Sequence, residues 1–309
     1  MAGRSELEER SARLRGLAWL LGAQSSDGSW GYRTGGAGYV EPTALATIAL
    51  VGEPGPDLDA VPAVQRATEF LRSLQHPDGS WSIRSGDDEP SWMTGYAMWA
   101  LARVERALGI GPTRAPLDAA IQWLLAEPRL RVSAEGVEAA RRISRVDGTL
   151  VGWPWLVEDT PWAFPTALGL IAAGIAGRAA APRVRQAVAY LYDRACEGGG
   201  WNVGNPYTFD KVYLPTLIDT AAVLLGLKAV GEGESDPALA GLARLQAMLA
   251  KAGSPLGLSW GLIAATARGV DLPAARTRLL ARQSPDGSWG DGPFATALAA
   301  LAVAAGPAV

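Results

Sequence analysis

Two kinds of helical segment alternate along the chain. Stretches such as "RLRGLAWLLGAQ" from Arg13 and "AVQRATEFLRSLQ" from Ala63 carry apolar residues at helical spacing with polar residues between them, which is typical of a helix with one buried face. Each is followed by a stretch in which small and apolar residues fill almost every position, such as "PTALATIAL" from Pro42. Such segments indicate helices that are buried all round. The pattern predicts an outer and an inner layer of helices.

A short polar motif marks the change from outer to inner helix. It reads "QSSDGSW" from Gln24, "QHPDGSW" from Gln75 and "QSPDGSW" from Gln283. The Asp-Gly pair predicts a tight turn. The glutamine falls in the last turn of a helix, where its amide can bond free backbone groups, and the tryptophan can pack over the turn. We interpret the motif as a structural staple.

The distance from the tryptophan to a following threonine sets the repeat. It is the same from Trp30 to Thr43, from Trp81 to Thr94 and from Trp153 to Thr166. Trp201 and Thr220 are further apart, Trp289 and Thr296 are closer, and a weaker unit without the turn runs through "ALAGLARLQAMLA" and "LGLSWGLIAATARG". We count six units with no leftover segment. Because the last unit is strongly apolar rather than a polar cap, a closed ring is favoured over an open solenoid.

The expected fold is therefore all-α, an (α/α)6 toroid of six helical hairpins around a central apolar cavity, with residues 1–309 as one domain. The chain has 309 residues, of which 49% are hydrophobic, and a net charge of -3. These values suit a large core and give no basic surface for nucleic acid. A single cysteine excludes an intrachain disulfide. No signal peptide and no run of roughly 20 apolar residues is evident, so we expect a cytoplasmic protein with a peripheral membrane contact as a further option.

The three Gln–Trp motifs resemble the QW motifs of the squalene-hopene cyclase, oxidosqualene cyclase and class II terpene cyclase family, within the prenyltransferase and squalene oxidase repeat proteins. The resemblance implies a toroid around an apolar cavity in which a polyprene folds and is cyclised. In that family an aspartic acid of a D-x-D-D-T-A motif protonates an alkene or epoxide, and aromatic residues stabilise the carbocations. Larger members carry two such domains, whereas this chain has room for one.

The acid motif is not intact in this chain. "TLIDTA" from Thr216 keeps the last aspartate as Asp219 but has Ile218 at the middle position, which holds the acid in the family. "YVEPTA" from Tyr39 has Glu41 at that position. Glu41 or Asp219 is the candidate proton donor, and Asp159 in "VEDTPW" is a third candidate. Each carboxylate also suits a helix N-terminus, where it caps free N–H groups, so both interpretations stay open.

Alignment of the repeats on their threonines places five residues at the middle position: Glu41, Trp92, Phe164, Ile218 and Phe294. If the ring closes, they lie at one level around a mouth of the cavity. Further candidates for the lining are Tyr96, Trp99, Trp162, Tyr213 and Trp260. Aromatic faces stabilise a cation by about 0.5–2 kcal/mol each, but aromatic residues also dominate ordinary cores. Arg33 and Arg84 occupy matching loop positions and suit a diphosphate group or plain solvation.

We expect a class II terpene cyclase-like enzyme, an isomerase or lyase, that cyclises a linear isoprenoid after protonation. The alternative is a protein that binds an isoprenoid or other lipid without chemistry, because a lone carboxyl in an apolar cavity becomes a weaker acid. No cofactor is expected, except Mg²⁺ if the substrate is a diphosphate. One cysteine and one histidine argue against a zinc prenyltransferase site, and the motif argues against an (α/α)6 glycosidase. The expected partner is a hydrophobic isoprenoid.

Overall fold

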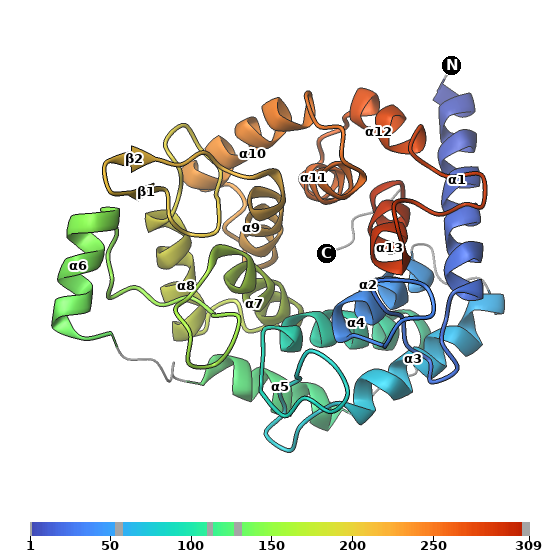
Figure 1. Ribbon diagram of the computed structural model, residues 1–309, viewed down its shortest axis with the longest axis horizontal. Coiled ribbons are helices and arrows are strands. Elements are labelled where there is room, and N and C mark those ends of the chain that lie inside the picture. The colour runs from blue at the N-terminus through green and yellow to red at the C-terminus, as the bar shows by residue number, and fades with distance from the viewer. Residues whose placement is uncertain (1, 53–57, 110–113, 127–131, 305–309) are drawn as a thin grey trace.

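A computed structural model describes residues 2–52, 58–109, 114–126 and 132–304. Helices of the outer layer alternate in sequence with helices of the inner layer (Figure 1). The outer helices are α1 (Ala2–Gly22), α3 (Val61–Ser73), α5 (Arg114–Leu125), α8 (Pro182–Asp193), α10 (Asp236–Leu249) and α12 (Pro273–Leu280). The inner helices are α2 (Val40–Val51), α4 (Met93–Leu108), α7 (Ala163–Ile175), α9 (Leu217–Ala229), α11 (Pro255–Ala267) and α13 (Pro293–Ala302). A 3-10 turn, Leu58–Ala60, precedes α3.

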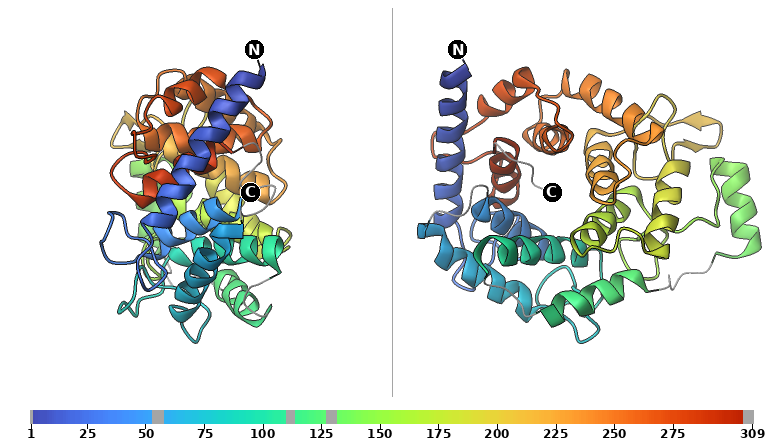
Figure 2. Two further views of the ribbon diagram at one scale, coloured as in Figure 1. Left: turned by 90° about the vertical axis from the view of Figure 1, so that its right-hand side faces the viewer. Right: turned by 180° about the vertical axis from the view of Figure 1, so that it is seen from behind.

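The inner helices form a closed ring. Each packs against the next in chain order, and α13 packs against α2, so the ring is seen from the front in Figure 1 and from behind in Figure 2. Every residue of α2 is buried, as expected for a helix surrounded by protein. Small residues make the close packing feasible: a Cβ on Gly226 of α9 would lie 2.7 Å from the Ala167 carbonyl oxygen of α7. The predicted (α/α)6 toroid is confirmed.

The tryptophan of each motif donates one hydrogen bond from its backbone and one from its indole ring. In the first unit the Trp30 backbone N–H donates to Thr43 Oγ1 at 3.0 Å, and the indole Nε1 donates to the Leu20 carbonyl of α1 at 2.9 Å. The same pair of bonds recurs at Trp81, Trp153, Trp201 and Trp289. The tryptophan therefore ties the end of an outer helix to the start of its inner helix.

The glutamine of each motif joins one unit to the next. Gln24 Nε2 donates to the Gly28 carbonyl of its own turn and to the Ala63 carbonyl of α3, both at 2.9 Å. Gln75 makes the matching bond to Pro116 of α5 at 2.9 Å. Gln283 reaches Ala12 of α1 at 2.8 Å, which links the last unit to the first. The staple predicted within one unit thus also holds neighbouring outer helices together.

Two elements lie outside the six-unit plan. Helix α6 (Ala134–Ser144) and a hairpin of β1 (Tyr207–Thr208) and β2 (Lys211–Val212) stand beside each other at the edge of the ring (Figures 1 and 2). The expectation that no segment is left over was wrong. Before Trp153 the third unit carries an additional helix, α6, that the other units lack in the described ranges.

The repeat turn survives between α6 and Trp153 in altered form. Asp147 Oδ1 accepts hydrogen bonds from Thr149 N and Thr149 Oγ1, as Asp27 does from Ser29. Trp153 then follows after three further residues.

Within the described ranges, no helix is long and apolar enough to cross a membrane.

Candidate active site

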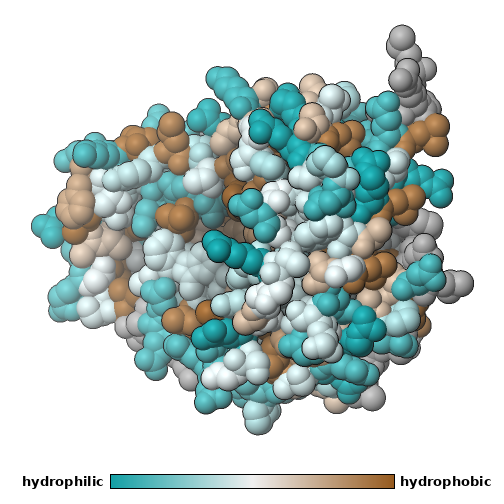
Figure 3. Space-filling model, turned by 45° about the vertical axis from the view of Figure 1, so that its right-hand side comes forward, coloured by the Kyte–Doolittle hydropathy of each residue, from teal (hydrophilic) through white to brown (hydrophobic). Residues whose placement is uncertain are grey.

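The inner helices begin on the face of the ring that carries the connecting loops. Backbone bonds link the start of one inner helix to the loop of the next unit, from Val40 N to Ile83 O at 3.0 Å, from Trp92 N to Trp155 O at 3.1 Å and from Ala163 N to Val203 O at 3.1 Å. Figure 3 views this face obliquely and shows polar side chains around a hollow with hydrophobic side chains in its depth. The aligned motif positions lie at this end of the ring, because each falls within the first turn of its inner helix or just before it.

Glu41 lies in the first turn of α2 and is only 6% exposed. The Tyr32 hydroxyl donates a hydrogen bond to Glu41 Oε2. The fully buried Tyr96 hydroxyl is near the same carboxyl, although its geometry falls short of a hydrogen bond. No lysine or arginine of the described ranges forms an ion pair with Glu41. The carboxyl is thus surrounded by phenol groups and hydrocarbon rather than by charge.

This environment controls the protonation of Glu41. Burial raises the pKa of the carboxyl, and the nearby Tyr32 and Tyr96 hydroxyls lower it by a smaller amount. The pKa values of Tyr32 and Tyr96 are themselves raised, first by burial and then by the Glu41 charge. The net effect favours a neutral carboxylic acid that can donate a proton. The same effect makes it a weaker acid than an ordinary glutamic acid.

Aromatic rings continue from Glu41 around the mouth. Trp92 meets Tyr96, Trp155 and Phe164 edge to face, with ring centroids 5.5, 4.5 and 5.8 Å apart. Phe164 in turn meets Trp260 of α11 at 5.4 Å. Trp99 stacks on Tyr96 at 6.5 Å, one turn deeper in α4. The structure therefore brings the predicted Trp92, Tyr96, Trp99, Phe164 and Trp260 into one cluster beside Glu41.

A second, smaller group of rings lies on the other flank of the carboxyl. Tyr32 contacts Tyr39 at 5.0 Å and Phe294 of α13 at 5.5 Å. Phe294 is thereby placed at the same mouth as Trp92 and Phe164. Ile218, at the same motif position in α9, is half-buried against the core.

Asp219 serves the start of α9. Its backbone N–H donates to Thr216 Oγ1 at 3.1 Å, and the Thr216 hydroxyl donates to Asp219 Oδ2 at 2.6 Å. Thr216 is thus the N-cap of α9, and the Asp219 carboxylate accepts from the Thr216 hydroxyl and not from the free N–H groups that the capping interpretation expected. Burial raises the pKa of Asp219, and the Thr216 bond opposes the shift. Asp219 is therefore a second buried acid, hydrogen-bonded to the N-cap residue of its helix.

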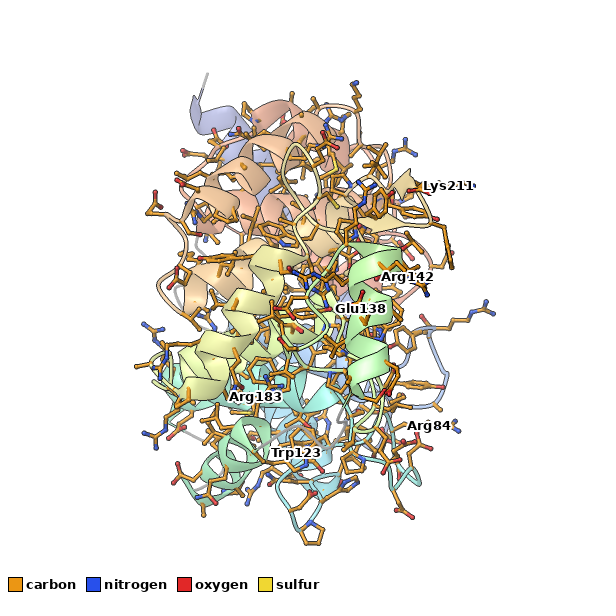
Figure 4. All side chains as sticks on the ribbon, turned by 90° about the vertical axis from the view of Figure 1, so that its left-hand side faces the viewer. Arg84, Trp123, Glu138, Arg142, Arg183 and Lys211 are labelled. Atoms are coloured by element: carbon orange, nitrogen blue, oxygen red, sulfur yellow. The ribbon has the colours of Figure 1, made fainter. Side chains whose placement is uncertain are left out.

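The remaining predicted residues lie in the loops. Asp159 is exposed and binds the Thr160 N–H and the Trp162 indole N–H, the latter at 3.1 Å. Tyr213 is 46% exposed, after β2. Arg33 and Arg84 are exposed, and Arg84 contacts Asp87 at 3.6 Å and lies 5.9 Å from the Tyr39 ring centre. Figure 4 shows Arg84 projecting from the loop face.

Two residues at the mouth were missed by the sequence argument. Tyr32 and Trp155 each lie two positions after a motif tryptophan, where the other units have Ile83, Val203 and Asp291. The same alignment that was applied to the threonines locates them, because this position follows the staple directly and faces the preceding inner helix. In the described ranges, no group of three His, Cys, Asp or Glu side chains is placed so that it could hold a metal ion.

No family model matches the chain. A probable squalene–hopene cyclase of Sinorhizobium fredii is 28% identical over 217 residues, which are 63% of this chain and 31% of that protein. The squalene–hopene cyclase of Alicyclobacillus acidocaldarius is 35% identical over 118 residues, which are 38% of this chain and 16% of that protein. The chain thus spans less than a third of the length of these curated relatives.

A variant of type II terpene cyclase MstE from Scytonema, solved in complex with the product merosterolic acid A, superposes over 98% of both chains with a TM-score of 0.62 at 16% identity. The likeness shows a shared fold over nearly the full length of both chains. The chain is related in sequence to squalene–hopene cyclases and shares the fold of the type II terpene cyclases, as the resemblance predicted.

Proposed function

We propose that the chain is a class II cyclase-like enzyme in which Glu41 donates a proton to a linear isoprenoid. The resulting cation then closes one or more rings. One observation carries this proposal: a buried carboxyl with a raised pKa stands at the start of an inner helix, next to a cluster of aromatic rings. The relatives' names and the product bound to MstE support an isoprenoid as the substrate class.

The chemistry asks three things of the site. The Glu41 carboxyl adds its proton to a terminal carbon–carbon double bond, which leaves a carboxylate and a tertiary carbocation. The faces of Trp92, Tyr96 and Phe164 stabilise the positive charge as it moves, by about 0.5–2 kcal/mol each and more where water is excluded. Loss of a proton from the cyclised cation ends the reaction. Tyr32 stabilises the Glu41 carboxylate by its hydrogen bond, so that the buried acid can release its proton.

The test is a product assay. Purified protein is incubated with squalene and, separately, with geranylgeraniol and geranylgeranyl diphosphate, and extracts are analysed by mass spectrometry coupled to chromatography. A cyclised isomer formed by the wild type and abolished by Glu41→Gln supports the proposal. Asp219→Asn is the matched control, because it alters the other buried acid; product lost only in Asp219→Asn transfers the acid role to that residue.

A second candidate is a non-catalytic isoprenoid-binding protein. It is favoured by the weakening of Glu41 as an acid through burial and by the hydrogen bond that Asp219 accepts from Thr216, the N-cap of α9. Under this candidate the same incubation returns the ligand unchanged, bound to the protein and independent of Glu41→Gln.

A further inference from the structure

A cavity of about 370 Å³ lies to one side of the ring axis. Its walls come from α4, α5, α6, α7, α8 and the loops beside them, and from no residue of α2, α9, α11 or α13. The volume lies within the range of about 300–1,000 Å³ that is usual for small-molecule sites. Glu41 is not among its lining residues. The cavity is therefore separate from Glu41, while Trp92 and the third candidate acid, Asp159, line it.

Tryptophan dominates the lining. The chain has 12 tryptophans, and five of them face this cavity: Trp92, Trp123, Trp153, Trp155 and Trp162. Leu150, Val151 and several prolines complete the apolar walls. Flat, rigid indole rings offer a large contact area to a hydrocarbon, at little cost in side-chain entropy.

The cations of the lining are already engaged. Arg183 donates to the Val151 carbonyl at 3.0 Å and lies 4.5 Å from the Trp153 ring centre. Arg194 pairs with Asp193 and donates to the Asp147 carbonyl at 3.3 Å. Both side chains therefore bind protein groups in the cavity wall, as does Asp159, the acid of the lining, which accepts hydrogen bonds from the Thr160 N–H and the Trp162 indole N–H. The Ser144 hydroxyl and the Asn205 amide remain as polar groups that suit one hydroxyl of a ligand.

Helix α6 covers this cavity. It presents Gly136, Ala140 and Ser144 to the lining, at four-residue spacing, while Glu138 and Arg142 project from the molecule (Figure 4). None of its residues is fully buried. It contacts the hairpin through the bond from Phe209 N to the Ile143 carbonyl, and Arg145, which follows the helix, lies 3.6 Å from the Tyr207 ring centre and pairs with Asp210 at 3.6 Å. The inward face of an amphipathic helix thus lies over a cavity and not over packed side chains.

From these observations we infer that the cavity under α6 binds an uncharged, mainly hydrocarbon molecule with at most one hydroxyl group, at a site distinct from Glu41. A ligand there fills the space between the tryptophans and the inward face of α6, and so stabilises the helix. The site does not depend on the protein being a cyclase, because Glu41 is not part of its lining.

Hydrogen exchange with farnesol as the probe tests the site. At a free concentration ten times its dissociation constant, a ligand that must leave before α6 opens slows amide exchange in this helix by about tenfold. Farnesyl diphosphate, which has the same hydrocarbon and a charged end, is expected to protect α6 at least about tenfold less at equal concentration. Its diphosphate would have to lose water, while both arginines of the lining already bind protein groups.

Two substitutions on one helix separate this cavity from the ring. Ala140→Trp fills the cavity from α6 and is expected to abolish both farnesol binding and its protection of α6. Glu138→Trp adds the same side chain on the solvent face and is expected to keep both. Circular dichroism melting checks the fold, and Ser144→Trp replaces Ala140→Trp if that variant melts early. Farnesol that binds Ala140→Trp and Ser144→Trp with unchanged affinity, or leaves α6 exchange in the wild type unchanged, overturns the inference.

Discussion

The hydroxyl of Thr43 accepts a hydrogen bond from the Trp30 backbone N–H at 3.0 Å and returns one to the Trp30 carbonyl at 3.2 Å. Trp30 lies before the connecting loop and Thr43 at the start of the inner helix, and both are fully buried. A buried N–H group needs a partner, and here a side chain from the next element supplies it. The spacing between tryptophan and threonine along the chain is thus the length of loop that this bond closes.

Loss of the Thr43 hydroxyl is expected to lower the free energy of unfolding. Thr43→Val keeps the side-chain shape but leaves the Trp30 N–H unpaired, which costs about 1–3 kcal/mol in the free energy of unfolding. The Trp30 carbonyl keeps the bond from Tyr39 N at 3.1 Å. Urea denaturation gives the value, and Thr43→Ser, which retains the hydroxyl, is the control. Equal stability of Thr43→Val and wild type would remove this bond from the account of the repeat.

The glycine of the motif is expected to be required for close approach as well as for its backbone angle. Gly28 has φ +87°, and a Cβ there would lie 2.5 Å from the Arg66 carbonyl oxygen of α3. Gly35 has φ +72° but nothing within 4 Å of its Cβ position. Both Gly→Ala changes bear a left-handed strain of roughly 1–2 kcal/mol. Gly28→Ala should lose at least about 1 kcal/mol more than Gly35→Ala in denaturant unfolding, and equal losses would contradict the contact.

Ring closure is expected to depend on Gln283 more than on its equivalents. Gln283→Ala removes the bonds to Ala12 and Gly287, at 2.8 and 2.9 Å, and the contact with Arg15. Each unmade bond costs about 0.5–1.5 kcal/mol, and the loss falls on α1, so hydrogen exchange in α1 should rise. Gln75→Ala removes the same kind of bond between α3 and α5 and should leave α1 exchange unchanged. A similar rise in both variants would argue against a special role in closure.

The raised pKa of Glu41 predicts a stability that falls as pH rises. In the unfolded chain the carboxyl loses its proton near the ordinary value of about 4.3, whereas the folded protein holds the proton to a higher pH. The contribution is complete below the unfolded pKa and is lost as pH rises toward the folded pKa. Within that window the slope approaches about 1.4 kcal/mol per pH unit.

Urea unfolding of wild type and Glu41→Gln over pH 4–8 measures this slope as a difference. Glu41→Gln should be flatter with pH than wild type, while the raised pKa of Asp219 keeps part of the slope in both proteins. Tyr32→Phe removes a hydrogen bond that lowers the Glu41 pKa, so it should widen the window toward higher pH. Identical pH profiles for wild type and Glu41→Gln would show that Glu41 ionises as an exposed carboxyl does.

The sequence predicts the ring because the repeated bonds are local. Trp30, Thr43 and their equivalents are close in the chain, so a fixed spacing reports one bonded geometry. It predicts the position of Glu41 for the same reason. The sequence does not predict that the hydroxyl of Tyr32, and not a second carboxyl, is the hydrogen-bond partner of Glu41. That contact depends on how the loop folds back over the start of α2.

Helix α6 marks where the periodic argument ends. Ala134–Ser144 has a clear apolar face, but no repeat partner indicates what that face covers. Asp159 shows the same limit. It lies in the loop before α7, whereas Glu41 and Asp219 lie in the first turn of their helices, and it is exposed and bonded to Trp162.

The central claim is that Glu41 delivers a proton to an isoprenoid, and the uptake of deuterium tests it most directly. Protein equilibrated in D₂O carries deuterium on Glu41, so protonation adds one deuteron to the substrate and the final deprotonation removes one hydrogen. The account predicts a cyclised product from squalene or geranylgeraniol that is one mass unit heavier than the substrate, absent with Glu41→Gln. Ligand recovered uncyclised and unlabelled from the wild type, or labelled product undiminished in Glu41→Gln, would contradict it.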